Sequence, residues 1–580
     1  MTSDQTKKRI AILGAGPSGL FMFKALLDSG LDNIEIHIFE RKQQVGAGMP
    51  YSTEGANDEH VTNVSDNEIP LIVTSIQDWA KTLDQHTLDR FRIDPVNFNP
   101  YRVLPRLLFG QYLSDQFQLL LKKAKTENIE VHLRTHYEVL DIIDQPNAAE
   151  VTVKVSDLGN LTFDHVIICT GHQWPKPHEG KIPGYFDSPY PPTKLQATLN
   201  HPIAVRGSSL TAIDAIRTLA RYHGKYEKKD GKLIFTTNEN ADQFRIVMHS
   251  RNGLLPAVRF HLEDSHLEND SLLTDLQLAQ HMASNNGFLS LDYIFENDFK
   301  EIIKGKDDKF YDKIKDFNLE GFVSYIMTFR ENVDAFDLLR AEYIEAEKSI
   351  KRRQSIFWKE MLGVLSFALN YPAKYLSAED MLRLKEVLSP LISIVIAYVP
   401  QSSCEELLAL HDSGVLSIVT VGSESEVEPI TTGGIIYQYN DDSGNKVEKF
   451  YKTFVDCIGQ PHLSPSQFPF QSLITQRTIS AAKLKFSSDE AGEKELKNGN
   501  KHVELDKQGD YWLNVPGIAI NDSFQVVDSY GAYNSRIYMM AVPYMGGFNP
   551  DYSGLDFCQE ASSRIAKSIG GEVTALKAIV

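Results

Sequence analysis

The chain has 580 residues, enough for more than one domain, and its 59 lysine and arginine residues face 77 aspartate and glutamate residues, a formal net charge of −18. Hydrophobic residues make up 42% and charged residues 23%, as in ordinary globular proteins. Because nucleic acids and anionic membranes are bound by basic surfaces, this charge argues against both as partners. We expect a globular protein, and the charge says little more about its function.

The cysteines and the termini exclude several further classes. Cys169, Cys404, Cys457 and Cys558 contain no C-x-x-C pair, so neither a disulfide scaffold nor a dithiol active site is predicted. No H-E-x-x-H or paired C-x-x-C spacing occurs, and we predict no metal site. Residues 1–9 are polar and lack the apolar core of a signal peptide, and the longest apolar run, 390–399, is too short to span a bilayer. We therefore expect a cytoplasmic protein.

Residues 9–40 read as strand, glycine loop, helix and strand, the order of a dinucleotide-binding βαβ unit. Each of the three glycines of the loop has its own role. The first permits the tight turn, the second lets the backbone approach a pyrophosphate, and the third lets helix and strand pack closely. The acid 21 residues after the third glycine stands where ribose hydroxyls are bound. The predicted contacts are Gly14, Gly16, Pro17, Ser18, Gly19, Glu40 and Arg41.

A second glycine-bearing loop, R-K-Q-Q-V-G-A-G-M-P-Y over residues 41–51, directly follows the acid. Flavoproteins of this fold commonly run such a loop past the flavin. We predict that it contributes Gly48, Met49 and Tyr51, together with Asn63 further along. For Tyr51 and Asn63, ordinary hydrogen bonding within a loop is the alternative.

A second nucleotide loop follows the apolar strand 203–205 and precedes a helix predicted over 211–222. The next strand, 244–248, leads to a serine and an arginine, a pair that suits a 2′-phosphate and favours NADPH over NADH. The polar stretch 224–242 is interpreted as a surface insertion that lengthens the spacing. The alternative is a degenerate unit with a structural role. The predicted contacts are Gly207, Ser208, Ser209, Thr211 and Arg251.

Two segments, 129–171 and 415–459, resemble each other. Each follows one nucleotide loop, reads as a β-meander, and closes on an apolar strand that ends in Cys-x-Gly. This pattern predicts a duplicated plan in which each half carries a meander and then returns the chain to the other domain. Cys169 and Cys457 are accordingly interpreted as buried packing residues.

The glycine loop 14–19, the segment 169–175 (C-T-G-H-Q-W-P), the tripeptide 182–184 (I-P-G) and the second loop together resemble the two-dinucleotide flavoproteins: flavin monooxygenases, N-hydroxylating monooxygenases and Baeyer–Villiger enzymes. The loop 45–52 with Asn63, and residues 250–256, look closer to a bacterial FAD/NAD(P)-binding branch. That branch includes amino-acid N-monooxygenases, such as those that oxidise the aspartate amine to nitrosuccinate. The resemblance covers roughly residues 8–260 and 400–570. It departs from the flavin monooxygenases at 185–190 (Y-F-D-S-P-Y), where we find no F-x-G-x-x-x-H fingerprint.

This resemblance implies an α/β fold with two Rossmann-like dinucleotide-binding domains, β-meanders and a helical insertion, and it implies FAD and NADPH as cofactors. It adds Thr170, Gly171, Gly546 and Gly547 to the expected cofactor contacts, with a helix over 554–569 whose N-terminus faces the isoalloxazine. We expect the FAD-binding domain at 1–185 and 461–580, the NAD(P)H-binding domain at 186–260 and 401–460, and a helical insertion that caps the substrate cleft at 261–400.

The implied function is an NADPH-dependent FAD monooxygenase that uses O₂ and oxygenates a small polar metabolite through a C4a-(hydro)peroxyflavin, with an amino-acid nitrogen as one candidate target. The alternatives are an NAD(P)H oxidase or reductase and a non-catalytic flavin-binding scaffold. We predict no catalytic residue and no oligomeric state. Arg259 and Arg340 are candidate clamps for a substrate carboxylate, with surface ion pairs as the alternative.

Overall fold

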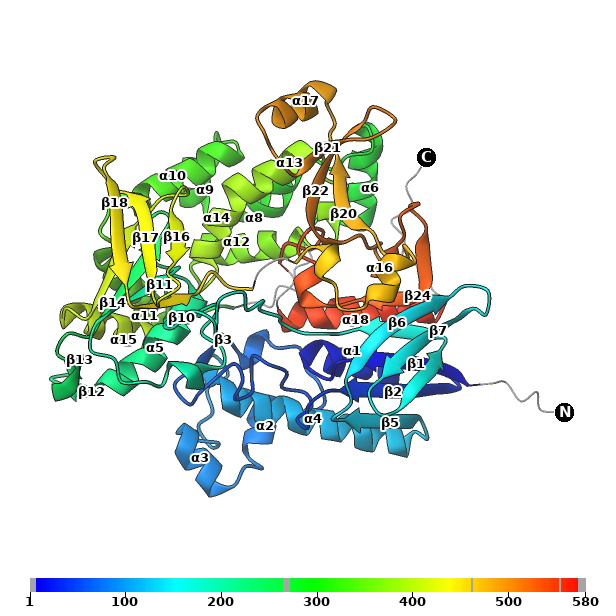
Figure 1. The fold of residues 1–580 in the computed structure, drawn as a ribbon, viewed down its shortest axis with the longest axis horizontal. Coiled ribbons are helices and arrows are strands. Elements are labelled where there is room, and N and C mark those ends of the chain that lie inside the picture. The colour runs from blue at the N-terminus through cyan, green and yellow to red at the C-terminus, as the bar shows by residue number, and fades with distance from the viewer. Residues whose placement is uncertain (1–6, 264–271, 461–462, 552–553, 572–580) are drawn as a thin grey trace.

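A computed structural model of the chain describes residues 7–263, 272–460, 463–551 and 554–571. Two parallel β-sheets stand apart in the molecule, and a group of middle helices lies along the top of both in the view of Figure 1. Within the described ranges, no helix is long and apolar enough to cross a membrane. The architecture is mixed α/β with a helical region, as expected.

The first sheet has the strand order β23-β24-β9-β1-β2-β5, so both ends of the chain contribute to it. Its strands pair in parallel except for the hairpin β23-β24 at one edge. The buried run of β1 is almost wholly apolar because both faces of the sheet are covered. Its elements are β1 (Lys8–Leu13), β2 (Ile34–Glu40), β5 (Glu130–Thr135), β9 (His165–Ile168), β23 (Gln525–Val527) and β24 (Tyr533–Met539), with helices α1 (Pro17–Asp28), α4 (Arg106–Thr126) and α18 (Leu555–Ile569).

The second sheet repeats this plan with the order β10-β19-β11-β14-β15, all parallel. In both halves a three-stranded antiparallel meander precedes the strand that returns to the parallel sheet. The second sheet contains β10 (Tyr185–Phe186), β11 (Pro202–Arg206), β14 (Arg245–Ser250), β15 (Leu416–Thr420) and β19 (Thr453–Asp456), with helices α5 (Leu210–His223) and α15 (Gln401–Asp412). The meanders are β6 (Val139–Gln145), β7 (Glu150–Val155) and β8 (Gly159–Phe163), and β16 (Glu426–Pro429), β17 (Ile435–Asn440) and β18 (Lys446–Tyr451).

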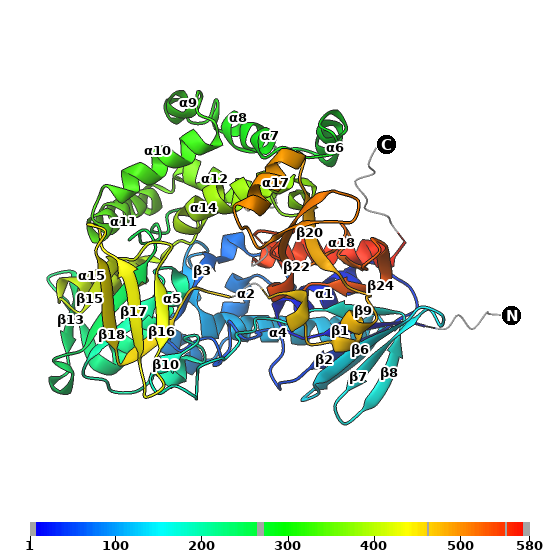
Figure 2. The ribbon, with the colours of Figure 1, turned by 45° about the horizontal axis from the view of Figure 1, so that its top comes forward.

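The middle helices are inserted between β14 and α15, within the crossover that joins β14 to β15. Figure 2 shows them as a green layer that extends over both sheets. They are α6 (Asp275–Ser284), α7 (Leu291–Phe295), α8 (Glu301–Ile303), α9 (Asp308–Ile314), α10 (Leu319–Glu331), α11 (Ala335–Arg352), α12 (Phe357–Ala368), α13 (Ala378–Arg383) and α14 (Ser389–Val395).

Several elements were not identified from the sequence. The polar stretch 224–242 forms a regular hairpin of β12 (Gly224–Lys229) and β13 (Lys232–Thr237), whose alternating charges hid its strand character. The C-terminal part contains a small sheet of β20 (Ala481–Lys485), β22 (Tyr511–Ile518) and β21 (Val503–Leu505), with α16 (Gln471–Thr475) before it and α17 (Asp489–Lys497) within it. Between β2 and α4 lie β3 (Val61–Ser65), α2 (Ile76–Ala80), α3 (Gln85–Phe91) and β4 (Val103–Pro105).

One buried histidine makes the second sheet sensitive to acid. His249 on β14 is 1% exposed, stacks on Tyr437 with ring centroids 4.0 Å apart, and has no hydrogen-bond partner for either ring nitrogen among the described residues. Burial lowers its pKa from 6.5 to about 4. The unfolded chain therefore binds a proton that the folded chain does not, and stability falls as the pH falls between these two values.

We predict that acidification across this window costs up to about 3 kcal/mol of unfolding free energy at this one site. The variant His249→Phe keeps an aromatic ring against Tyr437 and should lose that part of the pH dependence. The measurement is the urea-unfolding midpoint followed across the window in both proteins. An identical pH dependence in the two would refute the assignment.

Candidate functional site

The first glycine turn connects β1 to α1 and leaves one face of its backbone open. Gly14 has φ +106°, and a Cβ there would lie 2.6 Å from the Cys169 carbonyl oxygen. A Cβ on Gly19 would lie 2.1 Å from the carbonyl oxygen of Gly14, so the protein's own backbone requires these two glycines. At Gly16 the nearest atom is the Gly48 Cα, 3.3 Å away. The middle glycine is thus the one whose missing side chain leaves room for a ligand at the helix N-terminus.

The acid at the end of β2 is tied to this turn. One Glu40 oxygen accepts a hydrogen bond from the Ala15 amide at 2.9 Å, and the other accepts one from the Lys42 amide at 3.1 Å. Each carboxylate oxygen keeps a lone pair that ribose hydroxyls can use. Arg41, next along the chain, is exposed. These contacts place the acid where a dinucleotide ribose would lie beside the glycine turn.

The loop after the acid folds back onto the turn. The Gly46 amide donates to the Ala15 carbonyl at 2.6 Å. Gly48 has φ +60°, and a Cβ there would lie 2.8 Å from Pro17 Cδ. Met49 is half-buried next to it. The structure therefore brings both predicted glycine loops together around one space.

Tyr51 packs this loop against the first turn of α4, close to where α1 and α18 begin. Its ring lies edge-on to Phe109 of α4 with centroids 4.9 Å apart, and burial raises its pKa to about 12. Ser18 in the first turn of α1 lies 3.5 Å from the sulfur of Cys558 in the first turn of α18. The N-termini of α1 and α18 thus converge, as the predicted flavin site requires.

The C-terminal glycines have different surroundings. A Cβ on Gly547 would lie 2.2 Å from the Pro516 carbonyl oxygen, so packing against β22 already explains this glycine. Gly546 is half-buried. In the first crossover Thr170 is half-buried, whereas Gly171 is exposed and has open space on its Cβ side.

The second glycine turn reproduces the first more closely than its sequence does. Gly207 also has φ +106°, and a Cβ there would lie 2.8 Å from the carbonyl oxygen of Cys457. Ser209 takes the place of Gly16 and caps α5 without a side-chain hydrogen bond to the helix. Ser208 instead donates to the Leu254 carbonyl at 2.7 Å. The first-turn amides of α5, which include that of Thr211, have no acceptor within the helix and are of the kind that can bind an anion.

Arg251 directly follows β14 and is exposed. Its carbonyl accepts a hydrogen bond from the Gly422 amide at 3.1 Å, which anchors the backbone. Its guanidinium has no hydrogen bond or ion pair with any residue in the described part of the chain. The guanidinium of Arg251 is therefore available to a ligand at the end of β14.

The two crossovers between the halves are bonded to each other. The Gln173 amide donates to the Gln460 side-chain oxygen at 2.8 Å, and the Gln460 side-chain nitrogen returns a bond to the Gln173 carbonyl at 2.7 Å. The Trp174 indole donates to the Gly459 carbonyl at 3.1 Å. The chain segments that follow the two Cys-x-Gly motifs therefore run side by side.

The carboxyl edges of the two sheets face each other. In each parallel sheet the helices begin at the edge where the strands end. Arg106 in the first turn of α4 contacts Asp214 in the second turn of α5, with 2.5 Å between Nη1 and Oδ2. No sequence pattern marked either residue, because the two stand far apart in the chain. Their contact brings the N-terminal ends of α4 and α5 to one interface, and the second glycine turn lies at the N-terminus of α5.

The candidate carboxylate clamps are both engaged elsewhere. Arg259 is 3% exposed and its guanidinium bonds to Glu68, to Ser65 and to the Asn63 carbonyl. Arg340 on α11 pairs with Asp412. Arg340 thus forms an ion pair, as the alternative interpretation states. Arg259 instead is buried, and its guanidinium links the segment that follows β14 to residues 63–68. Asn63 is exposed beyond this link, with its backbone fixed and its side chain available.

The cysteines carry no redox pair. All four are free and buried. Burial raises the pKa of Cys558 to about 12 and the pKa values of Cys169, Cys404 and Cys457 still further. The thiols therefore stay protonated near neutral pH, which argues against disulfide chemistry.

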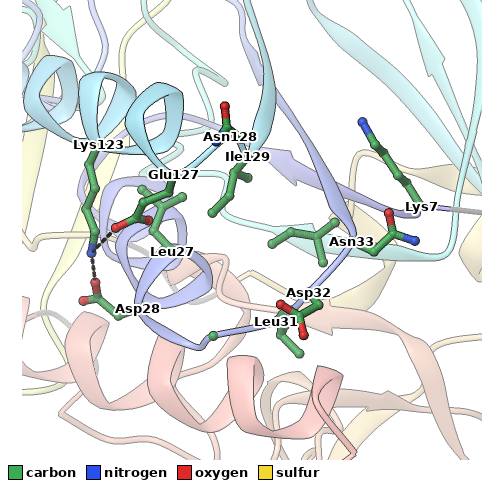
Figure 3. Close-up of a pocket in the computed structure, with 12 residues that line it drawn as sticks. Lys7, Leu27, Asp28, Leu31, Asp32, Asn33, Lys123, Glu127, Asn128 and Ile129 are labelled. Carbon is green, nitrogen blue, oxygen red and sulfur yellow. Dashed lines mark hydrogen bonds and ion pairs between the residues drawn. The ribbon is translucent and has the colours of Figure 1, made fainter. Parts of the chain in front are cut away.

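Two hollows lie outside the glycine turns. One of about 550 Å³ lies at the amino edge of the first sheet, opposite the turn, where Lys123 interacts with Asp28 and Glu127 (Figure 3). The other, of about 350 Å³, lies between β3, β4, α11 and the N-terminus of α15, and Arg259 and His261 are part of its wall. Neither is lined by a glycine turn.

One cluster has the composition of a metal site. Glu35, His37 and His132 place ligand atoms within 4.8 Å of one another on β2 and β5. Arg134 donates to His37 Nδ1 at 2.7 Å, so that nitrogen is an acceptor and Nε2 carries the ring proton, which it donates to Glu35. A metal at Nε2 would require the loss of this proton while arginine holds the other nitrogen. The cluster fits a hydrogen-bonded polar network.

Comparison with known families identifies two parts of the chain. Residues 11–173 match the profile of the family described as FAD-NAD(P)-binding, and residues 274–396 match that of the YdhS-like middle domain. The first match includes the glycine turn, the acid and the beginning of the first crossover. The second spans helices α6 to α14. The chain therefore carries an FAD/NAD(P)-binding domain followed by a YdhS-like domain.

Among curated relatives, the uncharacterized protein YdhS of Escherichia coli (strain K12) is 26% identical over 569 residues, which cover 97% of each protein. A segment of 171 residues, 28% of each chain, is 24% identical to the N-oxide-forming dimethylaniline monooxygenase 2 of Oryctolagus cuniculus.

Solved structures that align over most of this chain include an ornithine N-hydroxylase of Kutzneria sp. 744 and an L-lysine 6-monooxygenase of Pseudomonas syringae. Each is 13% identical with a TM-score of 0.45; the alignments cover 98% of this chain and 99% and 100% of those chains. At these scores the similarity carries no argument about activity, and the description of the fold rests on the strand order given above.

Proposed function

We propose that this protein is an NADPH-dependent FAD monooxygenase that oxygenates a small polar metabolite, with nitrogen as the target atom. The observation that carries the proposal is the pair of glycine turns with the same backbone geometry, at the facing carboxyl edges of two parallel sheets. One dinucleotide site would suffice for binding. Two sites that face each other serve transfer between two dinucleotides, and a nicotinamide and a flavin are the usual pair.

The residues at the first turn fit FAD. The open backbone at Gly16, which a Cβ would narrow, matches a pyrophosphate, and the carboxylate of Glu40 matches a ribose. The converging N-termini of α1 and α18 match an electron-rich ring. FAD, when bound, would accept a hydride from NADPH and activate O₂. The further contacts that we propose for it come from Pro17, Ser18, Arg41, Met49, Tyr51, Asn63, Thr170, Gly171, Gly546 and Gly547.

The protein's own role is to bind and orient the two cofactors and the substrate and to exclude water. Ser208 and Ser209 shape the second turn for a diphosphate, and Arg251 offers a free charge for the 2′-phosphate of NADPH. Tyr51, with its pKa raised, stays neutral and closes the first site on the side of α4. We propose residues 1–185 and 461–580 for FAD, 186–260 and 401–460 for NADPH, and 261–400 as the cap over the cleft.

Two observations support oxygenation over reduction of a disulfide. The cysteines are buried and protonated, which leaves no dithiol to receive electrons. The segment that aligns with the rabbit monooxygenase, a protein named for N-oxide formation, supports a nitrogen atom as the target.

We predict that the protein binds FAD in a 1:1 ratio and that NADPH bleaches the flavin without oxygen. The measurement is anaerobic titration with NADPH, followed by aerobic assay of NADPH, hydrogen peroxide and oxygenated product with panels of small amines and amino acids. Consumption of NADPH that appears wholly as peroxide with every compound would favour the oxidase reading. A flavin that NADPH does not bleach would refute the proposal.

A further inference from the structure

A buried ion pair ties helix α5 to the other half of the molecule. Asp214 is 5% exposed, and its Oδ2 accepts hydrogen bonds from Arg106 Nη1 at 2.5 Å and from the Tyr190 hydroxyl at 2.8 Å. Arg106 also donates through Nε to the Val61 carbonyl of β3 at 3.0 Å. Burial tends to raise the pKa of Asp214, but Arg106 lowers it below its ordinary value, so the carboxylate is ionised. Three separate segments therefore meet at one carboxylate.

A histidine makes a second tie to the same face of α5. His60 is fully buried, and its Nδ1 accepts from the Asn57 amide at 2.9 Å, so Nε2 carries the proton. That proton is shared by the Asp214 carbonyl and the Thr218 hydroxyl oxygen, each at 3.1 Å. The Thr218 hydroxyl in turn donates a hydrogen bond to Glu59 at 2.8 Å. Residues 214 and 218 are one helical turn apart, so the same face of α5 is bonded to Arg106 and to His60.

A neighbouring stripe of α5 is bound within its own half. Arg217 donates through Nε to Glu406 of α15 at 2.8 Å, and Arg221 donates through Nη2 to the same carboxylate at 2.7 Å. Glu406 of α15 is thus a second buried acid bonded to α5, and its bonds do not cross between the halves. The two carboxylates form a matched pair for experiment.

The bonds of Asp214 lie close to the second glycine turn. Asp214 stands four residues after the first helical residue, Leu210, which is about 6 Å along the axis. The second turn and the first turns of α5 are one continuous rigid piece. Whatever fixes Asp214 against Arg106 also fixes the distance of Gly207 from the first half.

We propose that Asp214 is a positioning residue for hydride transfer. Through Arg106 of the first half it holds α5, and with it the second glycine turn, at the separation from the first site that brings a nicotinamide to the flavin. This inference rests on the proposed function. Asp214 touches neither cofactor in this account and acts through the placement of α5.

The test compares Asp214→Asn with Glu406→Gln, a matched control at a second buried carboxylate that is bonded to the same helix. In anaerobic stopped-flow reduction by NADPH, Asp214→Asn should lower the limiting rate about tenfold to a hundredfold, because small misplacements of reacting groups are that costly. The NADPH Kd from the same titrations and the bound FAD should stay close to the parent values. Glu406→Gln should leave the limiting rate close to that of the parent.

Hydrogen exchange supplies a second readout that does not depend on turnover. Asp214→Asn should speed amide exchange in the crossovers 169–175 and 457–460, while β1 and β11 stay protected; Glu406→Gln should not affect the crossovers. Equal effects of the two variants, or an unchanged rate and exchange in folded Asp214→Asn, would overturn the inference. If Asp214→Asn does not fold, Arg106→Lys keeps the charge beside Asp214 but loses the bond to the Val61 carbonyl, and it carries the same expectations. If NADPH does not reduce the flavin of the parent protein, the proposed function is contradicted. The exchange data would still show whether Asp214 holds α5 against the first half.

Discussion

The variant Gly16→Val is expected to fold and to purify without flavin. Gly14 and Gly19 cannot make this test, because side chains there would collide with the protein's own carbonyl groups at 2.6 and 2.1 Å. At Gly16 the nearest atom to a new Cβ is 3.3 Å away, so the chain can adjust, whereas the space that the pyrophosphate would use is lost. We expect a loss of about 3 kcal/mol, about a hundredfold in the Kd for FAD.

The matched control is Ser209→Val, because Ser209 takes the same place in the second turn. It should keep FAD and weaken NADPH instead. The measurement is flavin absorbance per protein after gel filtration, with circular dichroism to confirm the fold. A folded Gly16→Val protein that keeps stoichiometric flavin would disprove the assignment of the first turn to FAD.

Arg251→Ala is expected to raise the KM for NADPH by about tenfold to a hundredfold and to leave the KM for NADH nearly unchanged. A hydrogen bond to a charged group contributes about 1.5–3 kcal/mol, which corresponds to that range. Because the residue is exposed, the preference for NADPH should shrink as salt is added.

Arg245→Ala is the control for this experiment. Arg245 lies at the opposite end of the same strand and donates to the carbonyls of Asp242 and Phe244. Its loss should affect neither KM. Equal increases for NADPH and NADH in Arg251→Ala would remove Arg251 as the reader of the 2′-phosphate.

The second turn shows where motif reading fell short. Its sequence lacks the second and third glycines, yet Gly207 has the same φ as Gly14 and meets the same kind of carbonyl. The turn needs glycine at its first position, where φ is positive, and tolerates serine where the first turn has its ligand-facing glycine. The strand before the loop and the helix after it therefore indicated the turn's backbone geometry better than the number of glycines did.

The segment 185–190 shows a different limit. The absence of a fingerprint there left it without a role, although Tyr190 donates to Asp214 at 2.8 Å. Tyrosine is common in buried and exposed positions alike, and its partner lies on another element. Without the fold, no feature of the local sequence distinguishes this residue from its neighbours.

The sequence by itself determined the main strands of the two parallel sheets, the helices that follow the two glycine turns, the turns themselves and the duplicated order of the halves. These follow from local requirements: apolar runs for strands covered on both faces, and glycine where φ is positive. The tertiary structure decided which polar groups meet. Arg106 and Asp214 are 108 residues apart, and Gln173 and Gln460 are 287 apart. A buried charge can be matched by a partner from any segment, and the packing of the two halves alone selects it.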